Sequence, residues 1–80
     1  MKNIIDIRSP FEYQKEHVNG AISLSYDNLL FYPEKYLTKE EEYYLYCSSG
    51  KRSEKLSSYL NQLGYHTMNL GSYSTIKKEL

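Results

Sequence analysis

Short apolar runs rich in β-branched and aromatic residues alternate along the chain with segments of helical character. The apolar runs predict strands over residues 3–7, 21–24, 43–46 and 66–70. The segments between and after them predict helices over residues 10–16, within 27–36, before Gly64 and over 74–80. Strands that alternate with helices favour an α/β fold, in which a short parallel sheet is covered by helices on both faces.

The helix before Gly64 has the clearest periodicity. Leu56, Tyr59, Leu60 and Leu63 fall at positions i, i+3, i+4 and i+7, which is the spacing of one helix face. We therefore expect these four side chains to form the buried face of that helix, and Gly64 to end it.

Cys47 is the single cysteine of the chain, and it stands directly after the apolar run 43–46. It opens the segment Cys47-Ser48-Ser49-Gly50-Lys51-Arg52-Ser53, which leads into the helix before Gly64. A thiol between a strand end and a helix start faces backbone N–H groups and the positive pole of the helix. Lys51 and Arg52 add two cations, and all these effects favour the thiolate. The segment predicts a reactive cysteine at the floor of an anion-binding loop.

Composition narrows the class of protein. Eighty residues predict one domain over residues 1–80, and one cysteine excludes an internal disulfide. Ten basic and ten acidic residues give no net charge, which argues against nucleic acid as a partner. The first residues reach a charge too soon for a signal peptide, and no apolar stretch is long enough to span a membrane. We expect a cytoplasmic protein with no membrane partner.

Four segments in this order resemble a single-domain rhodanese, a sulfurtransferase. They are Ile5-Asp6-Ile7-Arg8-Ser9-Pro10-Phe11-Glu12-Tyr13, His17-Val18-Asn19-Gly20-Ala21-Ile22, Tyr46-Cys47-Ser48-Ser49-Gly50-Lys51-Arg52-Ser53 and Leu63-Gly64-Tyr65. The resemblance implies a three-layer rhodanese-like domain and a catalytic cysteine that carries a persulfide sulfur from a donor to a nucleophilic acceptor. The family usually begins with a further strand and helix, so this sequence is expected to be a form shortened at its N-terminus.

The resemblance assigns roles to the residues round the cysteine. Cys47 is the expected catalytic residue, and Ser48, Ser49, Gly50, Lys51, Arg52 and Ser53 form the expected substrate-binding loop. Arg52 suits a sulfate-like oxyanion because its guanidinium has a planar fork of donors. Asp6 and Arg8 are expected to support the loop by an ion pair or backbone bonds, and His17 to fix the turn before Ala21. No zinc-ligand spacing is present, so neither a metal nor a cofactor is expected.

Three functions remain open at this stage. The first is a sulfurtransferase, for which the family implies thiosulfate as donor and cyanide, a small thiol or a protein thiol as acceptor. The second is a cysteine-dependent phosphatase or arsenate reductase, but such enzymes have five residues between cysteine and arginine, and here there are four. The third is a non-catalytic rhodanese-like module that binds proteins, although such modules commonly lack the cysteine.

Overall fold

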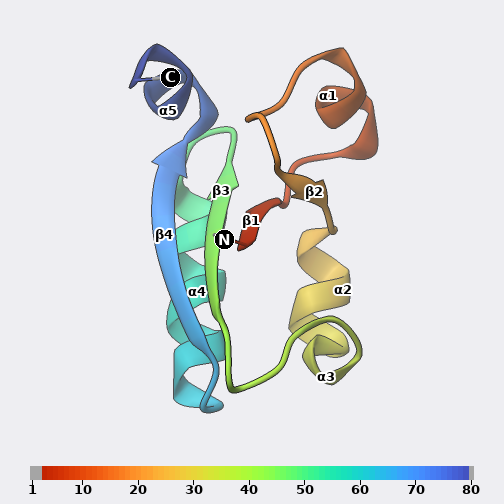
Figure 1. Ribbon diagram of the computed structural model, residues 1–80, viewed down its shortest axis with the longest axis vertical. Helices are drawn as coiled ribbons and strands as arrows, with labels where there is room; N and C mark the ends of the chain where they lie inside the picture. The colour runs from red at the N-terminus through yellow and green to blue at the C-terminus, as the bar shows by residue number, and fades with distance from the viewer. Residues whose placement is uncertain (1–2, 80) are drawn as a thin grey trace.

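The computed structural model describes residues 3–79, and the side chains of residues 3–77. The strands in this range are β1 (Asn3–Asp6), β2 (Ile22–Ser23), β3 (Glu42–Cys47) and β4 (His66–Ser72). The helices are α1 (Pro10–Lys15), α2 (Tyr26–Phe31), α3 (Pro33–Tyr36), α4 (Lys51–Gln62) and α5 (Tyr73–Glu79). All paired strands are parallel, in the order β2-β1-β3-β4 (Figure 1). This is the short parallel sheet that the sequence predicts.

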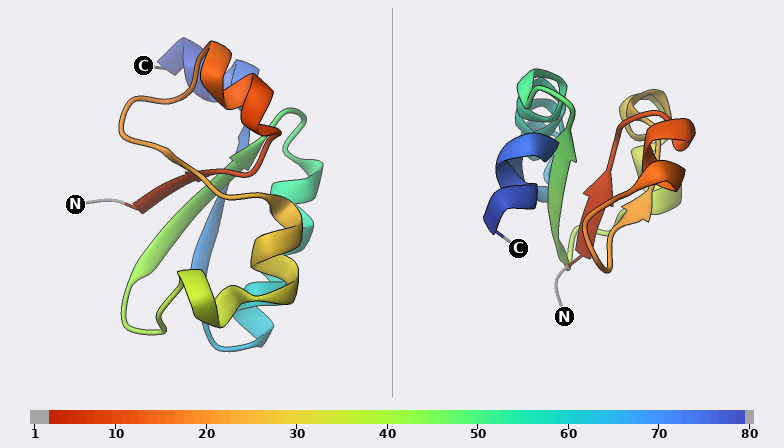
Figure 2. Two further views of the ribbon diagram at one scale, coloured as in Figure 1. Left: turned by 90° about the vertical axis from the view of Figure 1, so that its right-hand side faces the viewer. Right: turned by 90° about the horizontal axis from the view of Figure 1, so that it is seen from above.

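Apolar side chains pack on both faces of the sheet. Helices α2 and α4 cover one face, where Leu29, Leu56 and Leu60 meet Ile5 and Leu45 (Figure 2). On the other face, side chains from α1 and α5 pack on the strands, and this cluster consists of Val18, Ala21 and Tyr46 with Ile4, Tyr13, Leu70, Tyr73 and Ile76. Helices α1 and α5 both lie towards the carboxyl ends of the strands (Figure 1). The result is three layers that are most complete at that end.

The element boundaries differ from the predicted ones in places. The strand expected over residues 21–24 pairs only at Ile22–Ser23. The segment 27–36 holds two helices, because Pro33 cannot continue α2 and instead starts α3. The terminal helix begins at Tyr73, one residue earlier than expected, and its predicted end, Leu80, lies outside the described residues.

The predicted buried face of α4 is wrong for two of its four residues. Leu56 and Leu60 are fully buried, but Tyr59 is 40% and Leu63 41% exposed. The face that packs on the sheet also contains Ser53 and Ser57, and the Ser57 hydroxyl lies 2.6 Å from that of Thr67 on β4. These two serines are polar, so a prediction from apolar residues alone leaves them out of the buried face and includes Tyr59 and Leu63 instead. Small hydrogen-bonded serines allow α4 to approach the sheet closely.

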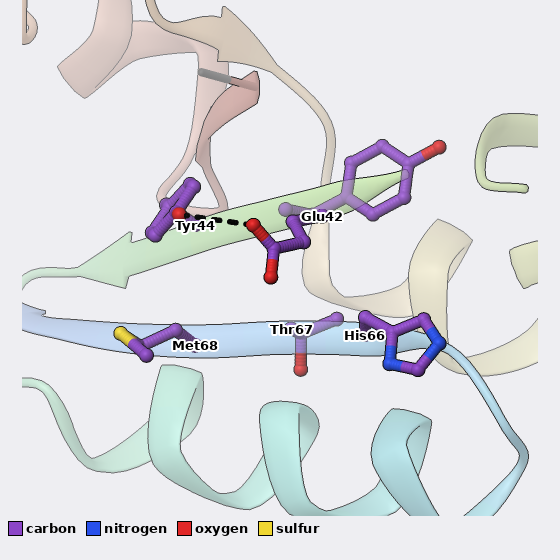
Figure 3. A pocket seen from close by; sticks show the side chains of 6 residues that line it. Glu42, Tyr44, His66, Thr67 and Met68 are labelled. Atoms are coloured by element: carbon purple, nitrogen blue, oxygen red, sulfur yellow. Dashed lines mark hydrogen bonds between the residues drawn. The ribbon is translucent and has the colours of Figure 1, made fainter. Parts of the chain in front are cut away.

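The face of the sheet on which α1 and α5 pack is less covered towards the amino ends of β3 and β4. Tyr44 and Met68 are register partners there, and Met68 is 59% exposed (Figure 3). The pocket beside them, lined also by Glu42 and His66, has a volume of only about 40 Å³. Ligands of parallel sheets bind beyond the carboxyl ends of strands, so the site is expected at the opposite end, where Cys47 lies. No helix within residues 3–79 is long and apolar enough to cross a membrane.

Candidate active site

Cys47 is the last residue of β3, and its side chain belongs to the core beneath α2 and α4. Only 3% of the residue is exposed. The chain then turns through Ser48 and Ser49 to Gly50, whose φ of 87° lies in the left-handed region that favours glycine. Helix α4 starts at the next residue, so its first turn stands directly above the sulfur.

The sulfur of Cys47 occupies the place of a helix cap. The N-cap residue of α4 is Gly50, and no side chain caps the helix there. The backbone N–H of Gly50 donates to Cys47 Sγ at 3.0 Å, and that of Ser53, the third residue of α4, donates at 3.4 Å. A capping side chain would normally accept a hydrogen bond at the third position. The cysteine therefore satisfies helix N–H groups that would otherwise lack an acceptor.

This arrangement changes the acidity of the thiol. Burial raises the pKa of Cys47, whereas its polar neighbours lower it, and the net result is a pKa below the ordinary value. These neighbours are the Ser53 hydroxyl, 3.4 Å from the sulfur in a contact in which either atom can be the donor, and the backbone N–H groups of Ser53, Gly50 and Arg52. Donors that point at the sulfur favour the charged form more than burial disfavours it. The thiolate, which is the nucleophilic form, is therefore favoured.

A pocket of about 290 Å³ opens above the cysteine. Its walls come from the end of β1, the start of α1, the loop after β3 and the start of α4, and they consist of Ile7, Arg8, Ser9, Glu12, Cys47, Ser48, Ser49 and Arg52. Arg52 and Glu12 bring a guanidinium and a carboxylate to these walls, whereas the guanidinium of Arg8 is paired with the Asp6 carboxylate. The guanidinium of Arg52 suits an anionic ligand next to the sulfur.

The structure separates the two cations of the loop. Arg52 lines the pocket, and its guanidinium carbon lies 5.6 Å from the centre of the Tyr26 ring. Lys51 is exposed and does not line this pocket, although its backbone N–H donates to Ser49 Oγ at 3.3 Å. The two side chains therefore stand in different positions relative to the cysteine, which their adjacent places in the sequence do not reveal.

Asp6 and Arg8 form an ion pair behind the pocket. Arg8 Nη2 donates to Asp6 Oδ2 at 2.7 Å, and the backbone N–H of Arg8 donates to Asp6 Oδ1 at 2.8 Å. The neighbouring carboxylate raises the pKa of Arg8. Asp6 is fully buried and also accepts the hydroxyl of Tyr46 at 2.8 Å, which ties the end of β1 to β3. Arg8 supports this end of the sheet and lines the pocket as well.

Glu12 enters the site without having been predicted there. Its carboxylate caps α1 by accepting from the backbone N–H of Ser9, and it also accepts the hydroxyl of Ser48 at 2.9 Å. The bond from Ser48 is the largest cause of the lowered pKa of Glu12. The sequence marks Glu12 as a first-turn acid, but only the fold brings it to the cysteine loop.

Asn69 is a second residue that the sequence does not single out. It lies on β4 and its side chain contacts Ser53 and Gly50 of the loop. Here β4 carries one extra residue, because Leu45 pairs with Asn69 whereas Tyr46 pairs with Gly71. This bulge turns the strand beneath the start of α4.

His17 lies apart from the cysteine pocket. Its ring stacks on that of Tyr13 with 3.7 Å between centroids, and Nδ1 lies 2.7 Å from the Tyr13 carbonyl oxygen. The Tyr13 hydroxyl in turn donates to the carbonyl of Ala21 at 2.7 Å. His17 thus contacts the residue that fastens the turn before Ala21. Among residues 3–79, no three His, Cys, Asp or Glu side chains are grouped closely enough to hold a metal.

The family model of the rhodanese-like domain matches residues 1–79. The chain belongs to this family. It is 34% identical over 77 residues to thiosulfate sulfurtransferase PspE of Escherichia coli strain K12, which covers 90% of this chain and 71% of PspE. It is also 34% identical over 62 residues to thiosulfate sulfurtransferase GlpE of Tolumonas auensis, covering 78% of this chain and 58% of that relative.

Solved rhodanese structures share the fold. A structure described as a rhodanese with anions from E. coli superposes with a TM-score of 0.80 and is 30% identical, covering 92% of this chain and 89% of its own. A rhodanese-related protein from Thermoplasma volcanium superposes with a TM-score of 0.84 at 25% identity, covering 98% of this chain and 78% of its own. The α/β rhodanese fold is confirmed, and the sulfurtransferase relatives confirm the expected enzyme class.

Proposed function

We propose that this rhodanese moves sulfane sulfur from thiosulfate, or a similar donor, to cyanide or a thiol through a persulfide on Cys47. The observation that carries the proposal is the sulfur of Cys47 itself, which accepts hydrogen bonds from the N–H groups of Gly50 and Ser53 and lies beneath a pocket lined by Arg52. The thiosulfate sulfurtransferases among its relatives support the choice of donor.

In the first step, the Cys47 thiolate attacks the outer sulfur of thiosulfate. A sulfur–sulfur bond forms to the enzyme, the bond within thiosulfate breaks, and sulfite leaves with the electron pair of that bond. Arg52 lines the pocket in which this oxyanion develops and is exposed, so it is the group that we expect to offset the charge of the oxyanion. The lowered pKa of Cys47 increases the fraction of thiolate, which can attack without a separate base.

In the second step, an acceptor attacks the terminal sulfur of the persulfide. Cyanide gives thiocyanate and returns the thiolate, while a thiol gives a persulfide of its own. Cys47 is the only cysteine of this chain, so no second thiol within it can collect the sulfur. We therefore propose an external acceptor, either a small thiol or a protein thiol.

Intact-mass measurement tests the proposal. After treatment with thiosulfate, the wild-type protein should gain one sulfur, and cyanide should remove it with formation of thiocyanate. Cys47→Ser should gain none. If the wild-type protein takes no sulfur from several sulfane donors, the alternative of a protein-binding module takes its place; hydrolysis of an aryl phosphate instead would favour the phosphatase.

A further inference from the structure

The side-chain amide of Asn69 has a fixed orientation. Its Oδ1 accepts the backbone N–H of Gly71 at 2.9 Å, and its Nδ2 donates to the carbonyl of Gly50 at 3.4 Å. A backbone N–H can only donate and a carbonyl can only accept, so exchanging Oδ1 and Nδ2 would lose both bonds. The atom that Asn69 turns towards Ser53 is therefore an oxygen without a hydrogen.

The hydroxyl of Ser53 has one hydrogen and three possible acceptors. Ser53 Oγ lies 2.5 Å from Asn69 Oδ1, 3.2 Å from the carbonyl oxygen of Gly50 and 3.4 Å from Cys47 Sγ. The shortest contact joins two oxygens, and only Ser53 can supply its hydrogen. The hydroxyl therefore donates to Asn69 and turns a lone pair towards Cys47.

We propose that Asn69 is a positioning residue for sulfur transfer, which holds the hydroxyl hydrogen of Ser53 away from Cys47. The sulfur then receives its hydrogen bonds from backbone N–H groups alone, and under this proposal these groups, not the Ser53 hydroxyl, lower its pKa. A hydroxyl hydrogen bond would stabilise the thiolate further, but it would also make that thiolate a weaker nucleophile. Asn69 thus preserves the nucleophilicity of the thiolate once it has formed. The inference rests on the proposed function only in taking Cys47 as the nucleophile.

Alkylation of Cys47 by iodoacetamide across a pH series tests this inference without any sulfur donor. Its outcome is therefore independent of whether the chain transfers sulfur. The wild type is compared with Asn69→Ala, Ser53→Ala and the double variant. The charged groups that face the cysteine, Arg8, Glu12 and Arg52 with the Asp6 carboxylate behind them, are the same in all four proteins.

Ser53→Ala alone should barely change the pKa of Cys47, because the hydrogen that it removes is held by Asn69. Asn69→Ala should lower that pKa by about one pH unit, since the freed hydroxyl then donates to the thiolate. The rate constant of the fully formed thiolate should fall about threefold. Adding Ser53→Ala to Asn69→Ala should abolish both changes.

Asn61→Ala is the matched control for loss of an asparagine between α4 and β4. Asn61 accepts the backbone N–H of Thr67 at 2.8 Å, away from the cysteine, so this variant should lower the melting temperature and leave Cys47 unchanged. Three results overturn the inference. The first is a clear rise in the pKa of Cys47 in Ser53→Ala alone, which would mean that the hydroxyl donates to the sulfur. The second is a change in Asn69→Ala that persists when Ser53→Ala is added, and the third is no change in Asn69→Ala.

Discussion

Gly50 packs directly against the backbone of Gly71. A Cβ added to Gly50 would lie 3.1 Å from the carbonyl carbon of Gly71 and 3.2 Å from the nitrogen of Ser72. This contact seats the cysteine loop on the bulge of β4, twenty-odd residues further along the chain. The loop geometry that points N–H groups at Cys47 therefore depends on a close contact between two backbone segments, which leaves little room for a side chain at position 50.

Gly50→Ala should lower the free energy of unfolding by about 2–3 kcal/mol, as the sum of a left-handed φ and a backbone clash. Gly20→Ala is the matched control, because Gly20 has a φ of 88° but nothing within 4 Å of an added Cβ. It should cost only about 1 kcal/mol. Urea unfolding measures both. Equal losses in the two variants would show that the approach to Gly71 is unimportant.

Cys47 should react with iodoacetamide along a pH profile whose midpoint lies below that of an ordinary thiol. The same chain unfolded in urea is an internal control, because it holds no other cysteine and loses the N–H groups of the loop. Its midpoint should return to about 8.5. Coincident profiles for the folded and unfolded protein would contradict the site described for Cys47.

Arg52→Ala should raise the KM for thiosulfate about tenfold, because a guanidinium that faces an oxyanion contributes a charge-assisted bond. Lys51→Ala removes a neighbouring cation that does not line the pocket, so its KM should stay close to that of the wild type. Both side chains are exposed, and neither change should move the melting temperature much. Steady-state assays of both variants measure these KM values. Similar increases in the two variants would indicate a long-range effect of positive charge and not a direct contact of Arg52 with thiosulfate.

The bond from Ser48 to Glu12 should make folding sensitive to acid. The pKa of Glu12 is lowered in the folded protein, so its contribution to stability is present above the unfolded value of 4.5 and is lost as the pH falls through the folded value. Glu12→Gln should therefore be less stable than the wild type at neutral pH, by about 0.5 kcal/mol. The difference should shrink below pH 4.5.

Unfolding curves between neutral and acidic pH measure this convergence. Glu34→Gln is a suitable control, because Glu34 is also an acid in the first turn of a short helix, α3. Its stability relative to the wild type should not follow the pH dependence of Glu12→Gln. A constant deficit of Glu12→Gln at all pH values would mean that the carboxylate charge plays no part.

Local sequence patterns predict much of the fold. The apolar run before Cys47 and the small residues after it predict a strand end and a helix start, and both are present. These features depend on residues next to one another in sequence. The buried face of α4 was predicted less well, since Ser53 and Ser57 are buried through hydrogen bonds and not through apolar character. Polarity alone therefore misled the assignment of Tyr59 and Leu63.

The less predictable parts of the site come from distant segments. Glu12 meets Ser48 across 36 positions and Asn69 meets Ser53 across 16. Both contacts depend on how α1 and β4 are placed round the end of β3, which the spacing within either segment does not reveal. Lys51 shows the converse, because its place beside Arg52 in sequence suggested a shared role that the helix geometry separates.

Cys47 is the last residue of a core strand, and its sulfur also accepts hydrogen bonds from the N-cap and from the first turn of α4. A covalent change at that atom should therefore also change the free energy of unfolding, because it alters these hydrogen bonds. Under the proposed chemistry, the enzyme would alternate between two states of different thermal stability, one with a thiolate and one with a persulfide at Cys47. Melting curves recorded before and after treatment with a sulfur donor would then measure the fraction of enzyme that carries the persulfide, without a coupled assay.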